Sequence, residues 1–324
     1  MNRLNEIANK TVFISCVVPV YNEEANILPF FTELRDKLAS LTTRFEMIAI
    51  NDGSRDNSQT QLRLAHQQLG VKVLQFSRNF GKETAITAGL DFTEGDVTII
   101  MDADFQHPFV TFDAFLAKWA EGYDMVYGLR TSRDDEKALK RLFANTFYRL
   151  MLTISNADIP ADAGDFRLLD RKVVDALKQT KERVRFMKGL YSWVGFKSIG
   201  IPFDVQDRAA GKSSWRFMKL LDLAITGIVS FSDIPLRAWS IIGFVISCLA
   251  FLSIIYTIID TLLFGVTVPG YATLLIVVTF FGGIQLLSVG ILGEYVARIF
   301  NEVKQRPTYL LNEKLGFEAK SSNS

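Results

Sequence analysis

The 324-residue chain has only two cysteines, Cys16 and Cys248, and a net charge of only +1. One cysteine falls in an expected core strand and the other in an expected membrane span, so no disulfide is predicted and a reducing compartment fits. The small net charge implies no global polyelectrolyte partner, and we expect no nucleic-acid ligand. The first residues, Met1 to Glu6, contain no apolar signal region. We therefore expect the first domain to stay in the cytoplasm.

The chain also lacks a Gly-x-Gly-x-x-Gly turn after its first apolar run, which ends in Pro-Val-Tyr-Asn-Glu. This absence argues against a dinucleotide-dependent dehydrogenase. Hydrophobic residues make up 49% of the chain and the mean hydropathy is +0.18, but the distribution is uneven. Up to about Arg237 apolar and charged residues are mixed, and two long apolar stretches follow.

Before Arg237, β-branched apolar runs alternate with segments of helical periodicity. The expected strands are Val12 to Val20, Phe45 to Ile50, Val71 to Phe76, Asp96 to Met101 and Asp124 to Leu129. The main expected helices are Glu23 to Leu41, Lys82 to Phe92 and Phe112 to Trp119. This alternation predicts an α/β fold with a mostly parallel sheet and helices on both faces. Ligands of such sheets bind at the carboxyl ends of the strands.

The apolar stretches Trp239 to Phe264 and Ala272 to Val296 are each long enough to cross a bilayer. Their basic flanks place both ends in the cytoplasm by the positive-inside rule; the alternative is a pair of buried core helices. Trp215 to Phe231 fits an interface helix, or else a surface helix. The predicted organisation is a catalytic domain at 1–213, interface helices at 214–236, two transmembrane helices within 237–298 and a tail at 299–324. From Leu315 onward we expect the tail to be frayed.

Two carboxylates, Asp102 and Asp104, follow the fourth expected strand with one residue between them. Together with Gln106 they offer hard oxygen ligands for Mg²⁺ or Mn²⁺; the alternative is an exposed turn in which Asp caps a helix. Asp52, after the second strand, is placed to accept a hydrogen bond from a base or ribose. Glu23, after the first strand, can reach back into the cleft; the alternative is a simple turn into a helix capped by Asn22.

Several segments together carry a family resemblance. They are Val18 to Glu24, Asn51 to Ser54, Ser77 to Glu83, Asp102 to Gln106, Gly164 to Leu168, Arg185 to Gly189 and Gly293 to Tyr295. With them the chain resembles the family 2 glycosyltransferases of the GT-A fold. More narrowly, it resembles membrane-bound polyprenyl-phosphate glycosyltransferases, most closely the bactoprenol glucosyltransferases of O-antigen modification. Dolichol-phosphate mannose synthases are related. The segments span almost the whole chain.

The resemblance implies an inverting, metal-dependent transfer of a hexose, glucose from UDP-glucose, to undecaprenyl phosphate. It also implies a multi-pass protein of the inner membrane whose catalytic domain and both termini are cytoplasmic, and related enzymes suggest a homo-oligomer. Alternatives are another donor (GDP-mannose or a UDP-amino sugar) or a non-catalytic membrane protein on the same fold. A processive polysaccharide synthase is disfavoured, because only two spans are expected and the Gln-x-x-Arg-Trp motif is absent.

The resemblance also implies residue roles. The nucleotide-sugar would be bound by Pro19, Tyr21, Glu23, Asp52, Lys82, Asp102 and Arg130. The metal, Mg²⁺ or Mn²⁺, would be held by Asp102, Asp104 and Gln106, next to which His107 replaces an Asp common in relatives. The acceptor phosphate would meet Arg208, Lys212 and Ser213. Asp165 matches the catalytic base. A phosphate acceptor needs a base less than a hydroxyl acceptor does, because the second pKa of a phosphate ester is about 6.

Overall fold

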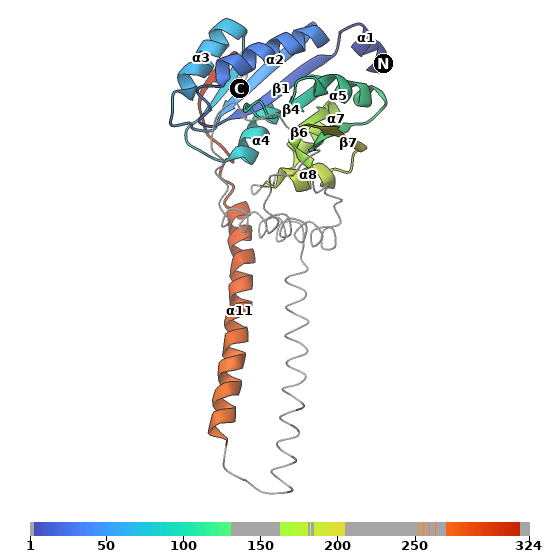
Figure 1. Cartoon of the computed structure of the whole chain (residues 1–324). Coiled ribbons are helices and arrows are strands. Elements are labelled where there is room, and N and C mark those ends of the chain that lie inside the picture. Colours follow the sequence, from blue (N-terminus) through green and yellow to red (C-terminus); the bar gives the residue numbers. More distant parts are fainter. Residues whose placement is uncertain are drawn as a thin grey trace, which may run out of the picture. The chain divides into compact units, whose positions relative to one another are not determined.

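The computed structural model describes residues 3–130, 163–180, 182, 185–204, 252, 255, 259, 263 and 270–317 (Figure 1). The chain divides into two units, residues 1–224 with 306–324, and residues 225–305. The first unit contains a sheet in the order β7-β5-β6-β4-β1-β2-β3-β8. Its strands are β1 (Phe13–Val20), β2 (Arg44–Asn51), β3 (Lys72–Phe76), β4 (Val97–Ile100), β5 (Met125–Arg130), β6 (Ala163–Asp170), β7 (Ser198–Phe203) and β8 (Leu311–Leu315).

The helices of this unit connect the strands in the alternating order that the sequence predicts. They are α1 (Arg3–Ala8), α2 (Ile27–Leu41), α3 (Ser58–Leu69), α4 (Lys82–Phe92), α5 (Thr111–Ala120), α7 (Arg171–Gln179) and α8 (Met187–Trp193). The sheet is mostly parallel, as expected: β1 pairs in parallel with β2 and β4, β2 with β3, and β5 with β7. β6 and β8 run in the opposite direction.

Helices cover both faces of the sheet, as predicted. On one face, Cys16 and Val18 of β1 belong to the same buried apolar cluster as side chains of α2, α3 and α5. On the other face, α4 packs against β1 and β2 so closely that a Cβ at Gly89 would lie 2.3 Å from Val17 Cγ1. Successive residues of a strand point to opposite faces, so Val17 and Val18 supply different cores.

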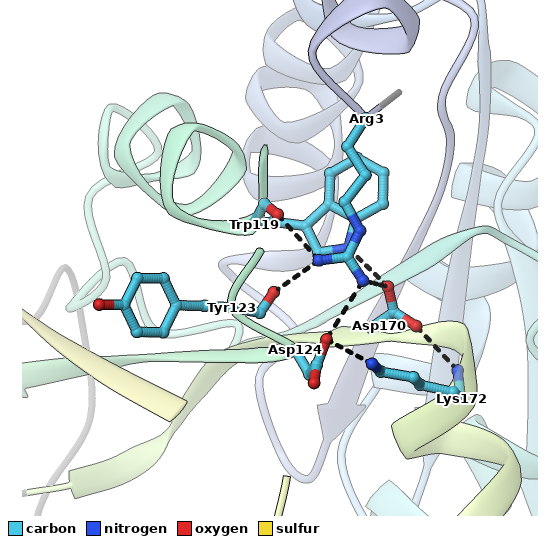
Figure 2. Close-up of polar contacts among 6 residues, drawn as sticks. All are labelled: Arg3, Trp119, Tyr123, Asp124, Asp170 and Lys172. Atoms are coloured by element: carbon cyan, nitrogen blue, oxygen red, sulfur yellow. Dashed lines mark hydrogen bonds and ion pairs between the residues drawn. The ribbon is translucent and has the colours of Figure 1, made fainter. Parts of the chain in front are cut away.

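The short helix α1 is fixed to the domain by Arg3, as Figure 2 shows. The Arg3 guanidinium donates to Asp170 Oδ2 at 2.7 Å and to Asp124 Oδ1 at 3.2 Å. It also donates to the carbonyl oxygens of Trp119 and Tyr123, at 3.0 and 3.1 Å. A six-residue helix is too short to be stable alone, so these contacts hold it in place.

The second unit contains α11 (Tyr271–Val303), which includes the second predicted span. Among the described residues, α11 is the one helix long and apolar enough to cross a membrane, by its length and composition. The first predicted span, Trp239 to Phe264, lies outside the described residues except for four helical positions. The interface helix predicted at Trp215 to Phe231 lies outside them entirely.

Candidate active site

The candidate site begins at the adjacent carboxyl ends of β1 and β2. Val20 pairs with Asn51 in the parallel ladder, and the next amide, that of Asp52, donates to the Val20 carbonyl at 3.0 Å. Tyr21 and Asp52 therefore follow neighbouring strand ends, while Pro19 lies within β1. The Tyr21 side chain is 42% exposed, whereas Asp52 is buried. An exposed aromatic ring beside a buried carboxylate fits the nucleoside contacts predicted for these residues.

The Asp52 carboxylate joins two loops of the site. Its Oδ1 accepts the backbone N–H of Phe80 at 2.6 Å, and its Oδ2 accepts that of Gly81 at 3.0 Å. Burial raises the pKa of Asp52, although the two N–H groups act to lower it. Gly53 has a φ of +64°, and a Cβ there would lie 2.4 Å from the Arg78 carbonyl carbon. The loops after β2 and β3 are therefore held tightly against each other.

The loop after β1 differs from the sequence prediction. The helix starts at Ile27 rather than at Glu23, and Asn22 is not its cap. Asn22 has a φ of +56°, and its side-chain oxygen accepts the N–H of Arg55 at 2.8 Å. This hydrogen bond connects the loop after β1 to the loop after β2. Glu23 Oε2 accepts a hydrogen bond from Asn26 Nδ2 at 2.8 Å.

The loop after β4 carries the predicted metal ligands. Asp104 is buried, and its Oδ1 accepts the N–H of Gln106 at 3.1 Å. The Asp102 N–H donates to His107 Nδ1 at 3.3 Å, and the imidazole ring stacks on Phe166 with centroids 4.6 Å apart. Burial lowers the pKa of His107, so its ring is neutral and Nδ1 can accept. His107 therefore supports the loop from inside.

The donor set of this loop fits a divalent cation that a substrate helps to hold. Asp102, Asp104 and Gln106 bring two carboxylates and an amide oxygen within five consecutive residues. The described part of the chain contains no group of three or more His, Cys, Asp or Glu side chains that could hold a metal alone. Mg²⁺ is commonly held by one or two carboxylates together with substrate phosphates, which is the arrangement this loop allows.

Lys82, the first residue of α4, contacts both the loop after β4, which carries the predicted metal ligands, and Asp165, the predicted base. Its Nζ lies 2.7 Å from Asp102 Oδ1, 2.9 Å from Asp102 Oδ2 and 2.8 Å from Asp165 Oδ2. Burial acts to lower the pKa of Lys82, but the two carboxylates outweigh it and raise that pKa above its ordinary value. Lys82 is therefore a cation between two carboxylates, one in the loop after β4 and one in β6.

Asp165 reaches this edge of the sheet because β6 runs antiparallel to β4. Ile100, the last residue of β4, pairs with Arg167, so the residues that precede Arg167 extend past the carboxyl end of β4. Burial acts to raise the pKa of Asp165, but the positive charges of Lys82, Lys188 and Arg167 prevail and hold it below its ordinary value. Asp165 is therefore a carboxylate at neutral pH.

Around Asp165 lie buried polar groups whose place in the site is not predicted from the sequence. Glu83 Oε2 accepts the N–H of Met187 at 3.0 Å, and burial together with the negative charge of Asp165 raises the pKa of Glu83 to about 8. The Arg167 guanidinium carbon lies 3.8 Å from the centroid of the Tyr191 ring. Asp165 Oδ1, Arg167 Nε and Tyr191 Oη are buried without a hydrogen-bond partner among the described residues.

One sequence signal was available for Arg167. It stands two residues after Asp165 in β6, and side chains two apart in a strand point to the same face. For Glu83 the signal was weaker, because only the three-dimensional packing of α4 against the segment at Met187 shows that its carboxyl group is buried.

Among the described residues, no hydrogen bond or ion pair connects the remaining predicted ligands to Lys82, Asp102 or Asp165. Arg130 is the last residue of β5, is exposed, and is close enough to act electrostatically on His107. The predicted acceptor ligands Arg208, Lys212 and Ser213 lie outside the described residues.

Comparison with known proteins gives the family. Residues 15–178 match Glycosyl transferase family 2. The chain is 43% identical over 309 residues to an uncharacterized glycosyltransferase from Synechocystis sp., covering 95% of this chain and 97% of the relative. It is 43% identical over 301 residues to the SfII prophage-derived bactoprenol glucosyl transferase of Shigella flexneri, covering 93% and 97%.

Among solved structures, the chain is similar to the mannosyl-3-phosphoglycerate synthase of Rubrobacter xylanophilus. It is 15% identical, with a TM-score of 0.48, over 73% of this chain and 76% of that one. The family match and the two relatives that share nearly the whole chain confirm the predicted α/β GT-A domain. The chain therefore belongs to glycosyl transferase family 2 and is a glycosyltransferase.

Proposed function

We propose that this enzyme transfers glucose from UDP-glucose to a polyprenyl phosphate, undecaprenyl phosphate, with inversion at the anomeric carbon. The observation that supports it most is the bridge that Lys82 forms between Asp102 and Asp165, which would join the donor side of the site to the acceptor side. The acceptor class is supported by the name of the Shigella flexneri relative, a bactoprenol glucosyl transferase.

On the donor side, Tyr21 and Asp52 would contact the nucleoside, with Pro19, Glu23 and Arg130 contributing to the nucleotide-sugar site. Asp102, Asp104 and Gln106 would hold Mg²⁺ or Mn²⁺, which would neutralise the charge that develops on the departing diphosphate. Lys82 already faces both oxygens of Asp102 and would supply a second positive charge close to the same phosphates.

On the acceptor side, the low pKa of Asp165 limits what this residue does. A phosphate ester with a second pKa of about 6 is mostly dianionic at neutral pH and is a nucleophile without a base. Asp165 would therefore orient the acceptor through Lys82 and take the residual proton from the monoanion. Attack by the phosphate oxygen on the anomeric carbon breaks the bond to the diphosphate in one displacement, which inverts that carbon.

The membrane arrangement belongs to the same proposal. The catalytic domain at 1–213 and the tail at 299–324 would face the cytoplasm, with spans at about 239–264 and 272–296 and an interface helix region at 214–236. Arg208, Lys212 and Ser213 would bind the acceptor phosphate at the membrane surface, where each cation contributes about 1 kcal/mol of attraction to anionic headgroups. The apolar composition of α11 supports the second span.

The test is to incubate the purified full-length protein with undecaprenyl phosphate, Mg²⁺ or Mn²⁺, and a panel of UDP- and GDP-sugars. Mass spectrometry of the lipid fraction should show a metal-dependent hexosyl lipid from UDP-glucose. Asp104→Asn and a chelator should abolish it, while Asp36→Asn on the exposed face of α2 should not. A product from GDP-mannose or a UDP-amino sugar, and none from UDP-glucose, would show that the donor is that other nucleotide-sugar. Nucleotide binding without any product would contradict the proposed transfer.

A further inference from the structure

The segment that follows α11 returns to the catalytic sheet. Its strand β8 pairs antiparallel with β3, with Val73 opposite Leu315 and Gln75 opposite Glu313. Glu313 also forms an ion pair of 2.8 Å with Arg63 of α3. The expectation that the chain frays from Leu315 is therefore wrong for Leu315 itself. Residues 318–324 lie outside the described residues.

Tyr309, just before β8, covers the end of β3. Its ring stacks on Phe76, with centroids 5.2 Å apart and planes at 16°. Its hydroxyl donates to Asp91 Oδ2 of α4 at 2.9 Å. The next residue in the chain, Leu310, accepts the N–H of Ser77 at 3.0 Å. Tyr309 and Leu310 therefore fix the point at which β3 ends and the loop 77–81 begins.

The loop 77–81 is the one that holds Asp52. Phe76 contacts Phe80 edge to face, with centroids 5.6 Å apart. Phe80 and Gly81 donate their backbone N–H groups to the Asp52 carboxylate. A continuous series of contacts thus runs from Tyr309 through Phe76 and Phe80 to Asp52, a candidate nucleotide-sugar ligand.

We propose that Tyr309 is a positioning residue for nucleotide-sugar binding, acting on Asp52 through Phe76 and the loop 77–81. The assignment of Asp52 to the donor rests on the proposed function, whereas the effect of Tyr309 on the loop does not. The segment after α11 then helps to shape the donor site, although it lies more than two hundred residues after Asp52 in the chain.

The first test measures hydrogen–deuterium exchange of the full-length protein in detergent, with no ligand present. Tyr309→Ala should speed the exchange of peptides covering 77–81 about two- to tenfold, the range expected for the loss of one aromatic pair. Tyr309→Phe, which keeps the ring and loses the bond to Asp91, should have a smaller effect. Asn312→Ala, an exposed position in β8, is the matched control. Protection of β1 should stay unchanged in all variants, which shows that the domain is folded.

The second test separates positioning from a general loss of structure. Tyr309→Ala should raise the KM for the sugar donor about two- to tenfold and leave the KM for the lipid acceptor unchanged. Unchanged exchange at 77–81, or equal effects on the two KM values, would overturn the inference. If the wild-type protein transfers no sugar, the proposed function and the donor assignment of Asp52 fail, and the exchange result alone decides whether Tyr309 orders the loop.

Discussion

Replacing Glu83 by Gln should stabilise this protein at neutral pH. Glu83 lies in the first turn of α4, and its carboxyl group accepts the Met187 N–H. Burial and the neighbouring charge of Asp165 raise its pKa from 4.5 to about 8, against the opposing effect of Lys82 and Lys188. The folded protein therefore keeps this carboxyl group mostly protonated at pH 7, while the unfolded chain ionises it.

The magnitude follows from proton linkage. Below pH 4.5 Glu83 is protonated in both states, so its stability contribution is fully present there. Between pH 4.5 and 8 that contribution is lost, at about 1.4 kcal/mol of unfolding free energy for each pH unit. The loss reaches about 3 kcal/mol at pH 7 and about 5 kcal/mol at pH 9. Gln keeps an oxygen for the Met187 N–H and has no charge to bury.

The assay is thermal unfolding of wild type and Glu83→Gln in the same detergent at pH 5, 7 and 9. The melting temperature of Glu83→Gln should exceed that of wild type by a margin that grows with pH and levels off above pH 8. Glu33→Gln, the same change at an exposed position of α2, should show no such growth. An equal margin at all three pH values would contradict the raised pKa, because Glu83 would then ionise alike in the folded and unfolded chain.

Two further predictions concern Asp165, the proposed base, and Arg3, which fixes helix α1 to the domain. Asp165→Asn should lower kcat/KM about 10- to 100-fold at pH 7, with a deficit that widens below pH 6 as the acceptor phosphate gains a proton. Nearly full activity across a pH–rate profile would remove Asp165 from the role of base. Arg3→Met should lower the free energy of unfolding by about 2 kcal/mol, because Asp124 and Asp170 lose a partly buried cation (Figure 2). Chemical denaturation measures this loss; Arg35→Met, at an exposed ion pair, should cost less than about 0.5 kcal/mol, and equal losses would contradict the anchoring role.

The sequence predicted the central elements of the domain well, because their apolar periodicity is strong. The predicted helix Lys82 to Phe92 has the observed bounds of α4, and β1 begins one residue later than predicted. The helix expected from Glu23 begins four residues later, at Ile27. Periodicity marks the apolar face of a helix, whereas the start depends on hydrogen bonds of the preceding loop, which come from another part of the chain.

Short elements that depend on distant partners were not predicted. Strand β8 reads Leu-Asn-Glu-Lys-Leu, with only its ends apolar, and it forms because β3 offers an unpaired edge. Helix α1 has six residues and no buried side chain of its own, and Arg3 holds it through contacts with residues more than a hundred positions away. Neither element carries a local signal strong enough to predict it.

Local sequence patterns are enough to show which residues end the strands, and hence that Asp52, Asp102 and Asp104 lie at one edge of a parallel sheet. This follows from local rules, since parallel strands joined by helices bring their carboxyl ends together. That Asp165 lies at the same edge depends on the folding of the whole domain. Asp165 lies there because β6 runs antiparallel to β4, and strand direction is set by the path of the whole chain. The same packing buries Glu83 beside Asp165 and places Lys82 between two carboxylates, and no spacing within the sequence encodes those distances.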